Sequence, residues 1–215
     1  MYSLFKKLFS KKVREVSNEQ ELFVFDYKDV LPRLFEVSFT LSENDKYTDI
    51  VFDVDNKEAP VLKPFMQDIS VGYGIDTDNE YKILQNKHLS ETLSIEALHH
   101  IALENFSASF LNNTRVEGSF DDVIMLINDG NNEAAMILLD LYWDELAEMF
   151  KNDICICIPQ KDLIFVTAKN NEAGLSKMRE LIKSVFSEIG TGGKLVKHIY
   201  ERQKAGWYIK ETINV

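Results

Sequence analysis

The stretch that decides the fold is Ile154-Cys155-Ile156-Cys157-Ile158-Pro159-Gln160-Lys161-Asp162-Leu163-Ile164-Phe165-Val166-Thr167-Ala168. Two short apolar runs, residues 154–158 and 163–168, flank a turn-forming tetrapeptide, which is typical of a pair of strands. A helical pattern follows over residues 172–189, with one apolar stripe formed by Leu175, Met178, Ile182 and Phe186. We therefore predict a strand-strand-helix unit in this part of the chain.

The same order of elements occurs twice more toward the N-terminus. The predicted strands and helices of these units are residues 115–120, 123–127 and 133–150, and residues 69–75, 81–84 and 95–111. Each helix has one apolar stripe to bury, and an antiparallel sheet built from hairpins is its natural partner. The sequence thus predicts an α+β fold, a mixed, mainly antiparallel sheet with helices packed on it, built from three successive ββα units.

The rest of the chain adds shorter elements. Residues 22–25 and 50–54 have the pattern of strands, residues 195–200 that of a helix or an irregular segment, and residues 207–213 that of a closing strand. Only four prolines and nine glycines are present, and no linker-length run of Pro, Gly or Ser interrupts the sequence. We therefore predict a single α+β domain over residues 17–215.

The first 16 residues have a different character from the rest. Leu4, Phe5, Leu8 and Phe9 recur at helical spacing with lysines between them, so residues 1–16 are predicted to form a basic amphipathic helix. Two interpretations remain open. The apolar face docks on the chain's own body or on a second copy, or residues 1–14 bind an anionic membrane surface.

Charge is distributed unevenly along the chain. Residues 1–14 carry five basic side chains and no acid, and residues 190–215 carry five basic side chains against two acids. Within a net charge of −11, these termini of +5 and +3 leave −19 for residues 15–189. A body this acidic repels a phosphate backbone, so we expect no nucleic-acid partner.

No apolar stretch is long enough to span a bilayer, and the N-terminus lacks a signal-peptide core with a small-residue cleavage site. Cys155 and Cys157 lie two residues apart, at the upper limit for a disulfide in an extended segment. Their spacing fits a reducing compartment. We expect a cytoplasmic protein.

The acidic run over residues 140–153 is the first candidate site. It comprises Asp140, Asp144, Glu145, Glu148 and Asp153, together with Tyr142 and Trp143. The ordinary interpretation is a solvated helix face. The functional interpretation is a non-enzymatic protein-binding module, in which the carboxylates steer a basic partner and Trp143 anchors it. The carboxylates are those of Asp140, Asp144, Glu145 and Glu148. An immunity-type inhibitor of a basic toxin is one concrete form.

A second candidate site lies where strands meet helices or turns. Asp129 and Glu133 occupy a strand-to-helix corner, and Lys161 and Asp162 a hairpin tip. Paired carboxylates there would act as acid and base in a hydrolase-like enzyme. The structural alternative is that the Asp129-Gly130 pair forms the turn, Glu133 stabilises a helix N-terminus, and Lys161 and Asp162 form an exposed ion pair.

The sequence predicts no metal site and no cofactor. Cys155 and Cys157 have no second cysteine pair, and the four histidines, His88, His99, His100 and His198, lack chelating spacing. Residues 190–194 contain three glycines and Lys194 but not the spacing of a phosphate-binding loop. A turn that ends a helix is the favoured interpretation of this segment.

Two segments carry a family resemblance. Residues 127–140, with the sequence Ile-Asn-Asp-Gly-Asn-Asn-Glu-Ala-Ala-Met-Ile-Leu-Leu-Asp, and residues 154–166, with the core Pro-Gln-Lys-Asp-Leu-Ile-Phe-Val, resemble the YtpQ-like family, a bacterial domain of unknown function. Residues 72–75 and 102–106 add to the similarity, which covers residues 60–210. Lys161 stands where that family often has arginine. The resemblance implies a bacterial cytoplasmic protein, without a reaction or a substrate.

Overall fold

The computed structural model describes residues 26–36, 55–77, 81–90, 92–128, 130–188, 193–204 and 206–215. Its strands are β1 (Val30–Glu36), β2 (Leu62–Met66), β3 (Ile69–Asp76), β4 (Tyr81–Ile83), β5 (Arg115–Gly118), β6 (Ile124–Ile127), β7 (Ile154–Gln160), β8 (Leu163–Ala168), β9 (His198–Gln203) and β10 (Gly206–Thr212). The α-helices are α2 (Ile95–Phe110), α3 (Asp140–Phe150) and α4 (Glu172–Ser187), and the 3-10 helices are η1 (Tyr27–Asp29), η2 (Asn86–His88) and η3 (Glu133–Leu138).

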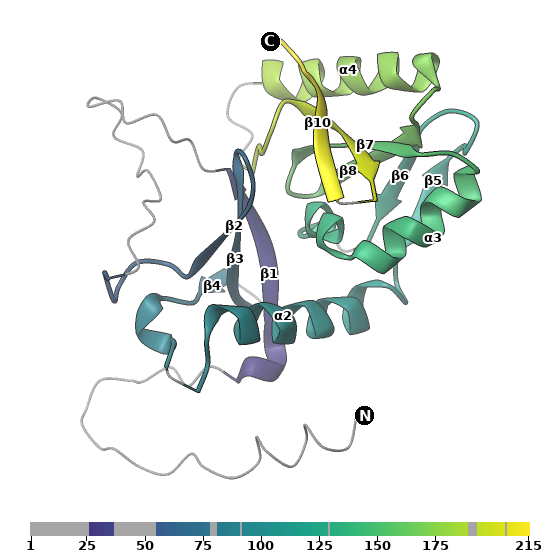
Figure 1. Cartoon of the computed structure of the whole chain (residues 1–215). Helices are drawn as coiled ribbons and strands as arrows, with labels where there is room; N and C mark the ends of the chain where they lie inside the picture. Colours follow the sequence, from purple (N-terminus) through teal and green to yellow (C-terminus); the bar gives the residue numbers. More distant parts are fainter. Residues whose placement is uncertain are drawn as a thin grey trace, which may run out of the picture.

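The strands form two sheets (Figure 1). A four-stranded sheet has the order β1-β3-β2, with β4 also paired to β3, and a six-stranded sheet has the order β10-β9-β7-β8-β6-β5. The strand pairings of the described residues are antiparallel. The predicted α+β class is therefore confirmed, and its strands are divided between two sheets.

Strand β7 shows why the six-stranded sheet forms. Its side chains alternate between two faces, as in any strand. Ile154, Ile156 and Ile158 enter the larger hydrophobic core, which also contains residues of the four-stranded sheet, η3 and α3. Cys155 and Cys157 face a second core under α4, as free and buried thiols. The thiols and the isoleucines of β7 therefore lie on opposite faces of the sheet.

The helices cover different parts of the two sheets. Helix α2 packs against β1 of the four-stranded sheet, and α4 against β7 and β8 of the six-stranded sheet (Figure 1). Ser94 caps the N-terminus of α2, because its hydroxyl accepts the N–H of Ala97 at 3.2 Å. Helix α3 lies on the face of the six-stranded sheet opposite α4, where it meets β10.

The continuous helix predicted over residues 133–150 is wrong. Residues 133–138 form η3, the backbone of Leu139 is not helical, and α3 begins at Asp140. The indole N–H of Trp143 donates to the carbonyl of Met136 at 2.7 Å, and that of Trp207 to the carbonyl of Ile137 at 3.2 Å. An unbroken α-helix would use both carbonyls for its own backbone, so the two indoles stabilise the break.

Strand β9 corrects a second prediction. His198, Ile199 and Tyr200 were expected to be helical or irregular, yet they begin a strand that pairs with both β7 and β10. The predicted closing strand is present as β10. The elements predicted for residues 1–16, 22–25 and 50–54 lie outside the described residues, as does Asp129. None of the described helices has the length and apolar character needed to cross a membrane.

Candidate functional site

Trp143 belongs to the interior, which corrects its assignment as an anchor for a partner. Helix α3 buries Trp143 and Leu146, one turn apart, against the larger core. The Trp143 ring is fully buried and packs edge-on against Trp207 of β10, with 5.3 Å between ring centres. Its only polar atom is already bonded to Met136. Trp143 therefore fixes α3 on the sheet and presents nothing to a partner.

Two of the predicted docking carboxylates, Asp140 and Asp144, are held by one arginine. The guanidinium of Arg202 on β9 contacts the Asp140 carboxylate at 2.7 Å and that of Asp144 at 3.1 Å. Arg202 itself is almost buried and lies over the Trp207 ring, 5.3 Å from its centre. The aspartates are exposed, and the single positive charge of Arg202 offsets part of their negative charge.

The other two carboxylates, Glu145 and Glu148, have no such balance. Within the described part of the chain, neither makes an ion pair or a hydrogen bond. Glu148 lies in the last turn of α3, which contains no basic residue. The partial negative charge of a helix C-terminus repels a carboxylate there. This arrangement costs stability, and a cation bound nearby would relieve it.

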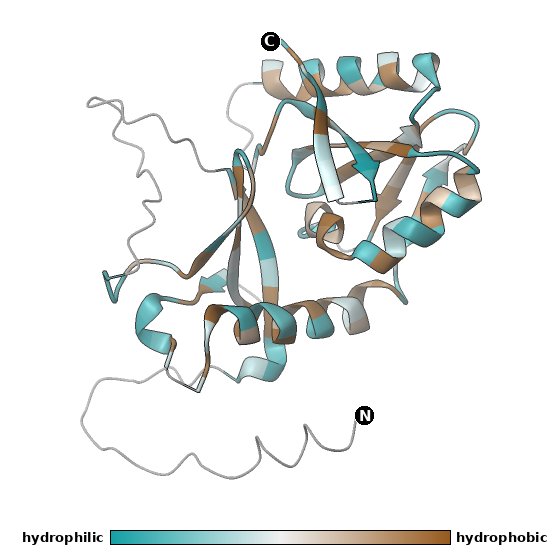
Figure 2. Ribbon diagram, viewed as in Figure 1, coloured by the Kyte–Doolittle hydropathy of each residue, from teal (hydrophilic) through white to brown (hydrophobic). Residues whose placement is uncertain are grey.

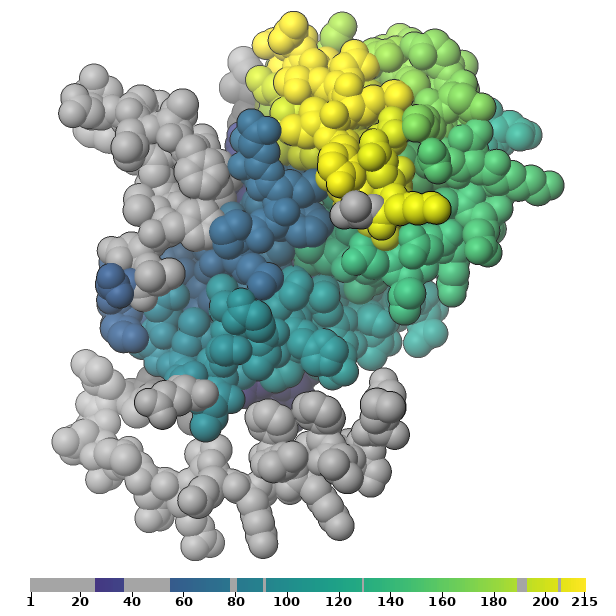
Figure 3. Space-filling model, in the orientation of Figure 1, coloured from purple at the N-terminus to yellow at the C-terminus, as the bar shows by residue number. Residues whose placement is uncertain are grey.

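Apolar side chains accompany these free carboxylates. Leu141 is 80% exposed and Met149 62% exposed. Leu141 and Glu145, and Glu145 and Met149, are four residues apart, and Glu148 follows Glu145 by three, so the four side chains lie on one side of the helix; we call this set the α3 outer face. Figure 2 shows hydrophobic residues interspersed with hydrophilic ones along α3. In Figure 3 this green part of the surface lies beside the yellow β10.

A shallow cleft of about 410 Å³ borders the α3 outer face. It lies between the C-terminal half of α3 and the end of β9, and its lining includes Glu148, Lys151, Asp153, Arg202 and Lys204. Charges of both signs meet in this cleft. It widens the area that a partner can contact next to Glu148, although it is open to solvent and lacks the enclosed shape of a small-molecule site.

The corner proposed for an enzyme is built differently from a catalytic pair. Glu133 is only 1% exposed. One carboxylate oxygen accepts the backbone N–H groups of Asn128 at 3.0 Å and Gly130 at 2.6 Å, while the other has no hydrogen-bond partner among the described residues. Glu133 thus ties together the loop that precedes η3, and Gly130 supplies the positive φ of 79° that the loop needs.

Lys161 and Asp162 approach this corner from the β7–β8 turn. The Lys161 carbonyl accepts the N–H of Ala134 at 3.0 Å, and the Lys161 ammonium contacts the side chain of Asn131 at 3.4 Å. Asp162 has one buried carboxylate oxygen without a partner in the described part of the chain. The structure therefore joins the two predicted corners through the backbone. It shows no contact between the Glu133 and Asp162 carboxylates.

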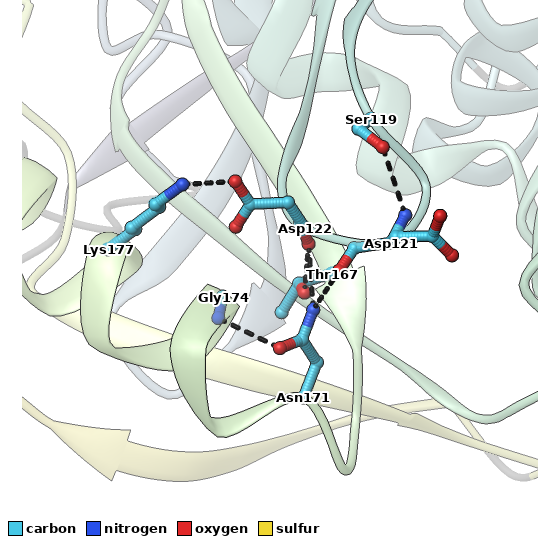
Figure 4. A network of polar contacts seen from close by, with 7 residues as sticks. All are labelled: Ser119, Asp121, Asp122, Thr167, Asn171, Gly174 and Lys177. Carbon is cyan, nitrogen blue, oxygen red and sulfur yellow. Dashed lines mark hydrogen bonds and ion pairs between the residues drawn. The ribbon is translucent and has the colours of Figure 1, made fainter.

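A separate polar network fastens the β5–β6 turn to α4 (Figure 4). The Asn171 side chain caps α4 by accepting the N–H of Gly174 at 3.1 Å, and it donates to the carbonyls of Asp121 and Asp122. Lys177 of α4 contacts the Asp122 carboxylate. The Thr167 hydroxyl donates to the Asp122 carbonyl at 2.5 Å. The network satisfies backbone groups at a helix start, which is a structural role.

Another contact, missed by the sequence reasoning, joins the two sheets. The His198 imidazole lies 2.9 Å from the Asp68 carboxylate through one nitrogen and 2.9 Å from the Thr212 hydroxyl through the other. Asp68 belongs to the turn between β2 and β3, whereas His198 and Thr212 face each other on β9 and β10. Both ring nitrogens are therefore engaged in holding the sheets together.

The described residues also bear on the predictions for a metal site and for the glycine-rich segment before Lys194. No group of three His, Cys, Asp or Glu side chains among them is placed to hold a metal ion. The Lys194 ammonium donates to the carbonyl of Glu188 at 2.5 Å, so it caps the C-terminal end of α4. Comparisons with protein-family models, curated proteins and solved structures found no match to this chain.

Proposed function

We propose that this protein is a non-enzymatic protein-binding module that binds a basic partner through the α3 outer face. One observation carries the proposal: α3 exposes Leu141 and Met149 beside Glu145 and Glu148, carboxylates without an ion pair in the described residues. Apolar side chains supply contact area, and unpaired carboxylates attract a positively charged surface. An immunity-type inhibitor of a basic toxin is one protein of this kind.

The arrangement of α3 supports this proposal over a simply solvated helix. Arg202 fixes Asp140 and Asp144, and the buried Trp143 fixes the helix axis, so the outer face is held rigidly. A rigid surface loses little conformational entropy on binding. The proposal also includes the YtpQ-like resemblance of residues 60–210 and a bacterial cytoplasmic setting, both of which are supported by the sequence alone.

The test uses a defined probe, a short fluorescent peptide with leucines on one helical face and lysines on the other. Anisotropy titrations compare the full chain with the variant Glu145→Lys/Glu148→Lys and with Leu141→Ser. We expect both to weaken binding by about tenfold or more, which corresponds to about 1.4 kcal/mol. Raising NaCl from about 50 to about 300 mM should weaken wild-type binding, because salt screens exposed charges.

The matched control is Glu180→Lys. Glu180 is exposed on α4 and, like Glu145, has no ion pair among the described residues. This variant should bind the probe with at most the loss expected from one reversed charge on a distant face. Equal affinities for wild type and the Glu145→Lys/Glu148→Lys variant, or equal losses for the α3 and α4 variants, would contradict the proposal.

A further inference from the structure

The α3 outer face sets three requirements on whatever binds it. Leu141 and Met149 are eight residues apart on a helix, about 12 Å at 1.5 Å per residue, and both need apolar contacts. Glu145 and Glu148 between them need positive charge, most of all at the C-terminal end of the helix. The ligand must therefore be basic, carry apolar side chains, and lie along α3.

The chain contains one segment of this composition. Residues 1–14 hold five basic side chains and no acid, and the apolar residues Leu4, Phe5, Leu8 and Phe9 lie among the lysines. These residues lie outside the part of the chain that the structure describes. Helix α3 has the complementary composition, with four acids and no basic residue between Asp140 and Phe150. The charges of the two segments are therefore complementary, and both segments carry apolar side chains.

Covalent attachment favours this pairing over others. Residues 15–25 connect the basic segment to Asp26, the first described residue. Eleven extended residues reach at most about 36–40 Å, at roughly 3.3–3.6 Å each. A tether that spans the distance between two sites gives an effective concentration on the order of millimolar. A weak interaction is then enough to keep the face occupied by the chain's own segment.

We propose that residues 1–14 bind the α3 outer face of the same chain and compete there with any other basic ligand. This inference rests on the proposed function, because it assigns an internal ligand to the same surface. The binding partner then has to displace the segment, so its apparent affinity is lower in the full chain than on an unoccupied face.

Hydrogen exchange of the full chain, followed by mass spectrometry on peptides covering residues 1–14 and 140–150, tests the contact. One variant reverses the segment (Lys6→Glu, Lys7→Glu, Lys11→Glu, Lys12→Glu), one reverses the face (Glu145→Lys, Glu148→Lys), and one combines both. We expect slowed exchange of residues 1–14 in wild type, loss of protection in either single reversal, and its return in the combined variant. Glu180→Lys should match wild type.

Three results would overturn the inference. The first is identical exchange of residues 1–14 in wild type and in the face reversal. The second is protection that disappears on dilution, which would assign the contact to a second copy. The third is protection that arises only with vesicles of anionic phospholipid and is unaffected by the face reversal, which would assign the segment to a membrane.

A second measurement separates this inference from the proposed function. A chain beginning at residue 15 retains the described hydrophobic core, which starts at Val30. It should bind the leucine-lysine probe about tenfold more tightly than the full chain does, because the internal competitor is gone. Equal, measurable binding by both chains would disprove the internal contact alone. Absence of binding by both would disprove the proposed function as well.

Discussion

Arg202 of β9 binds Asp140 of α3 at 2.7 Å across 62 residues of sequence. The contact joins a strand in the interior to the first residue of a surface helix, and Asp144 adds a second contact one turn later. A single arginine therefore contacts half of the acidic side chains of α3 and offsets one of their negative charges. Glu145 and Glu148 are the acids of α3 that make no ion pair within the described residues.

The first prediction concerns this arginine. Arg202→Met should lower the free energy of unfolding by about 1–3 kcal/mol, because charged hydrogen bonds and the packing on Trp207 are lost. Asp140→Asn and Asp144→Asn should each cost less than about 1 kcal/mol, since both carboxylates are largely exposed. Urea unfolding measures all three. Aspartate variants as destabilising as Arg202→Met would show that the arginine is not the main contributor.

The Arg202 contacts also predict that the acids of α3 contribute unequally to binding of the leucine-lysine probe. Asp140→Asn should leave the affinity for the leucine-lysine probe within about threefold of wild type, because Arg202 already balances that charge. Glu148→Gln should weaken the affinity more, because its charge is unbalanced in the described residues. Anisotropy titration at low salt makes the comparison. A larger loss for Asp140→Asn than for Glu148→Gln would contradict this division of the acids.

Local patterns in the sequence predicted most of the elements. The strands and helices over residues 154–187 follow from apolar periodicity that a few neighbouring residues define. The break before α3 could not be predicted in this way, because it depends on Trp207, 70 residues from the carbonyl that it binds. Alternation of His198, Tyr200 and Arg202 with Ile199 and Glu201 was the available signal for β9, yet the charged residues concealed it.

The candidate site was predicted only in part. Glu145 and Glu148 are exposed on α3, as a solvated or docking face requires. The burial of Trp143 was not foreseen because an aromatic residue in an acidic run fits either an anchor or a core position. Arg202 and the His198–Asp68 contact escaped notice because their partners are distant in sequence, and no spacing rule connects residues 62 or 130 positions apart.

The burial of Trp143 gives a prediction that distinguishes core from surface. Trp143→Phe should destabilise the protein by about 2–4 kcal/mol, because it leaves a cavity and removes the buried indole hydrogen bond to the Met136 carbonyl. Probe affinity should stay within about twofold of wild type at a temperature where the variant is folded. Thermal unfolding and anisotropy provide the two readouts. A folded variant with strongly reduced affinity for the probe would show that Trp143 contributes to binding.

Gly174 provides a test of the network in Figure 4. A Cβ atom at this position would lie 2.1 Å from the Thr167 hydroxyl oxygen and 2.9 Å from the Asp122 carbonyl oxygen. Gly174→Ala should therefore destabilise the chain by about 1–3 kcal/mol. Combined with Thr167→Ala, the loss should be smaller than the sum of the two single losses, since the nearest obstacle is removed. Additive losses would mean that the Thr167 hydroxyl is not the obstacle.

The last prediction concerns pH and His99. The Tyr73 hydroxyl lies 2.9 Å from Nδ1 of His99, and burial of the imidazole, assisted by Lys63, lowers the pKa of His99 below its ordinary value of 6.5. The unfolded chain therefore binds this proton more readily than the folded chain does. The contribution of a neutral His99 to stability is present above about pH 6.5 and is lost as the pH falls below it.

Urea unfolding between about pH 7.5 and 5.5 should show a smaller decrease in stability for His99→Gln than for wild type. Parallel curves for wild type and His99→Gln would exclude His99 as a source of the acid sensitivity.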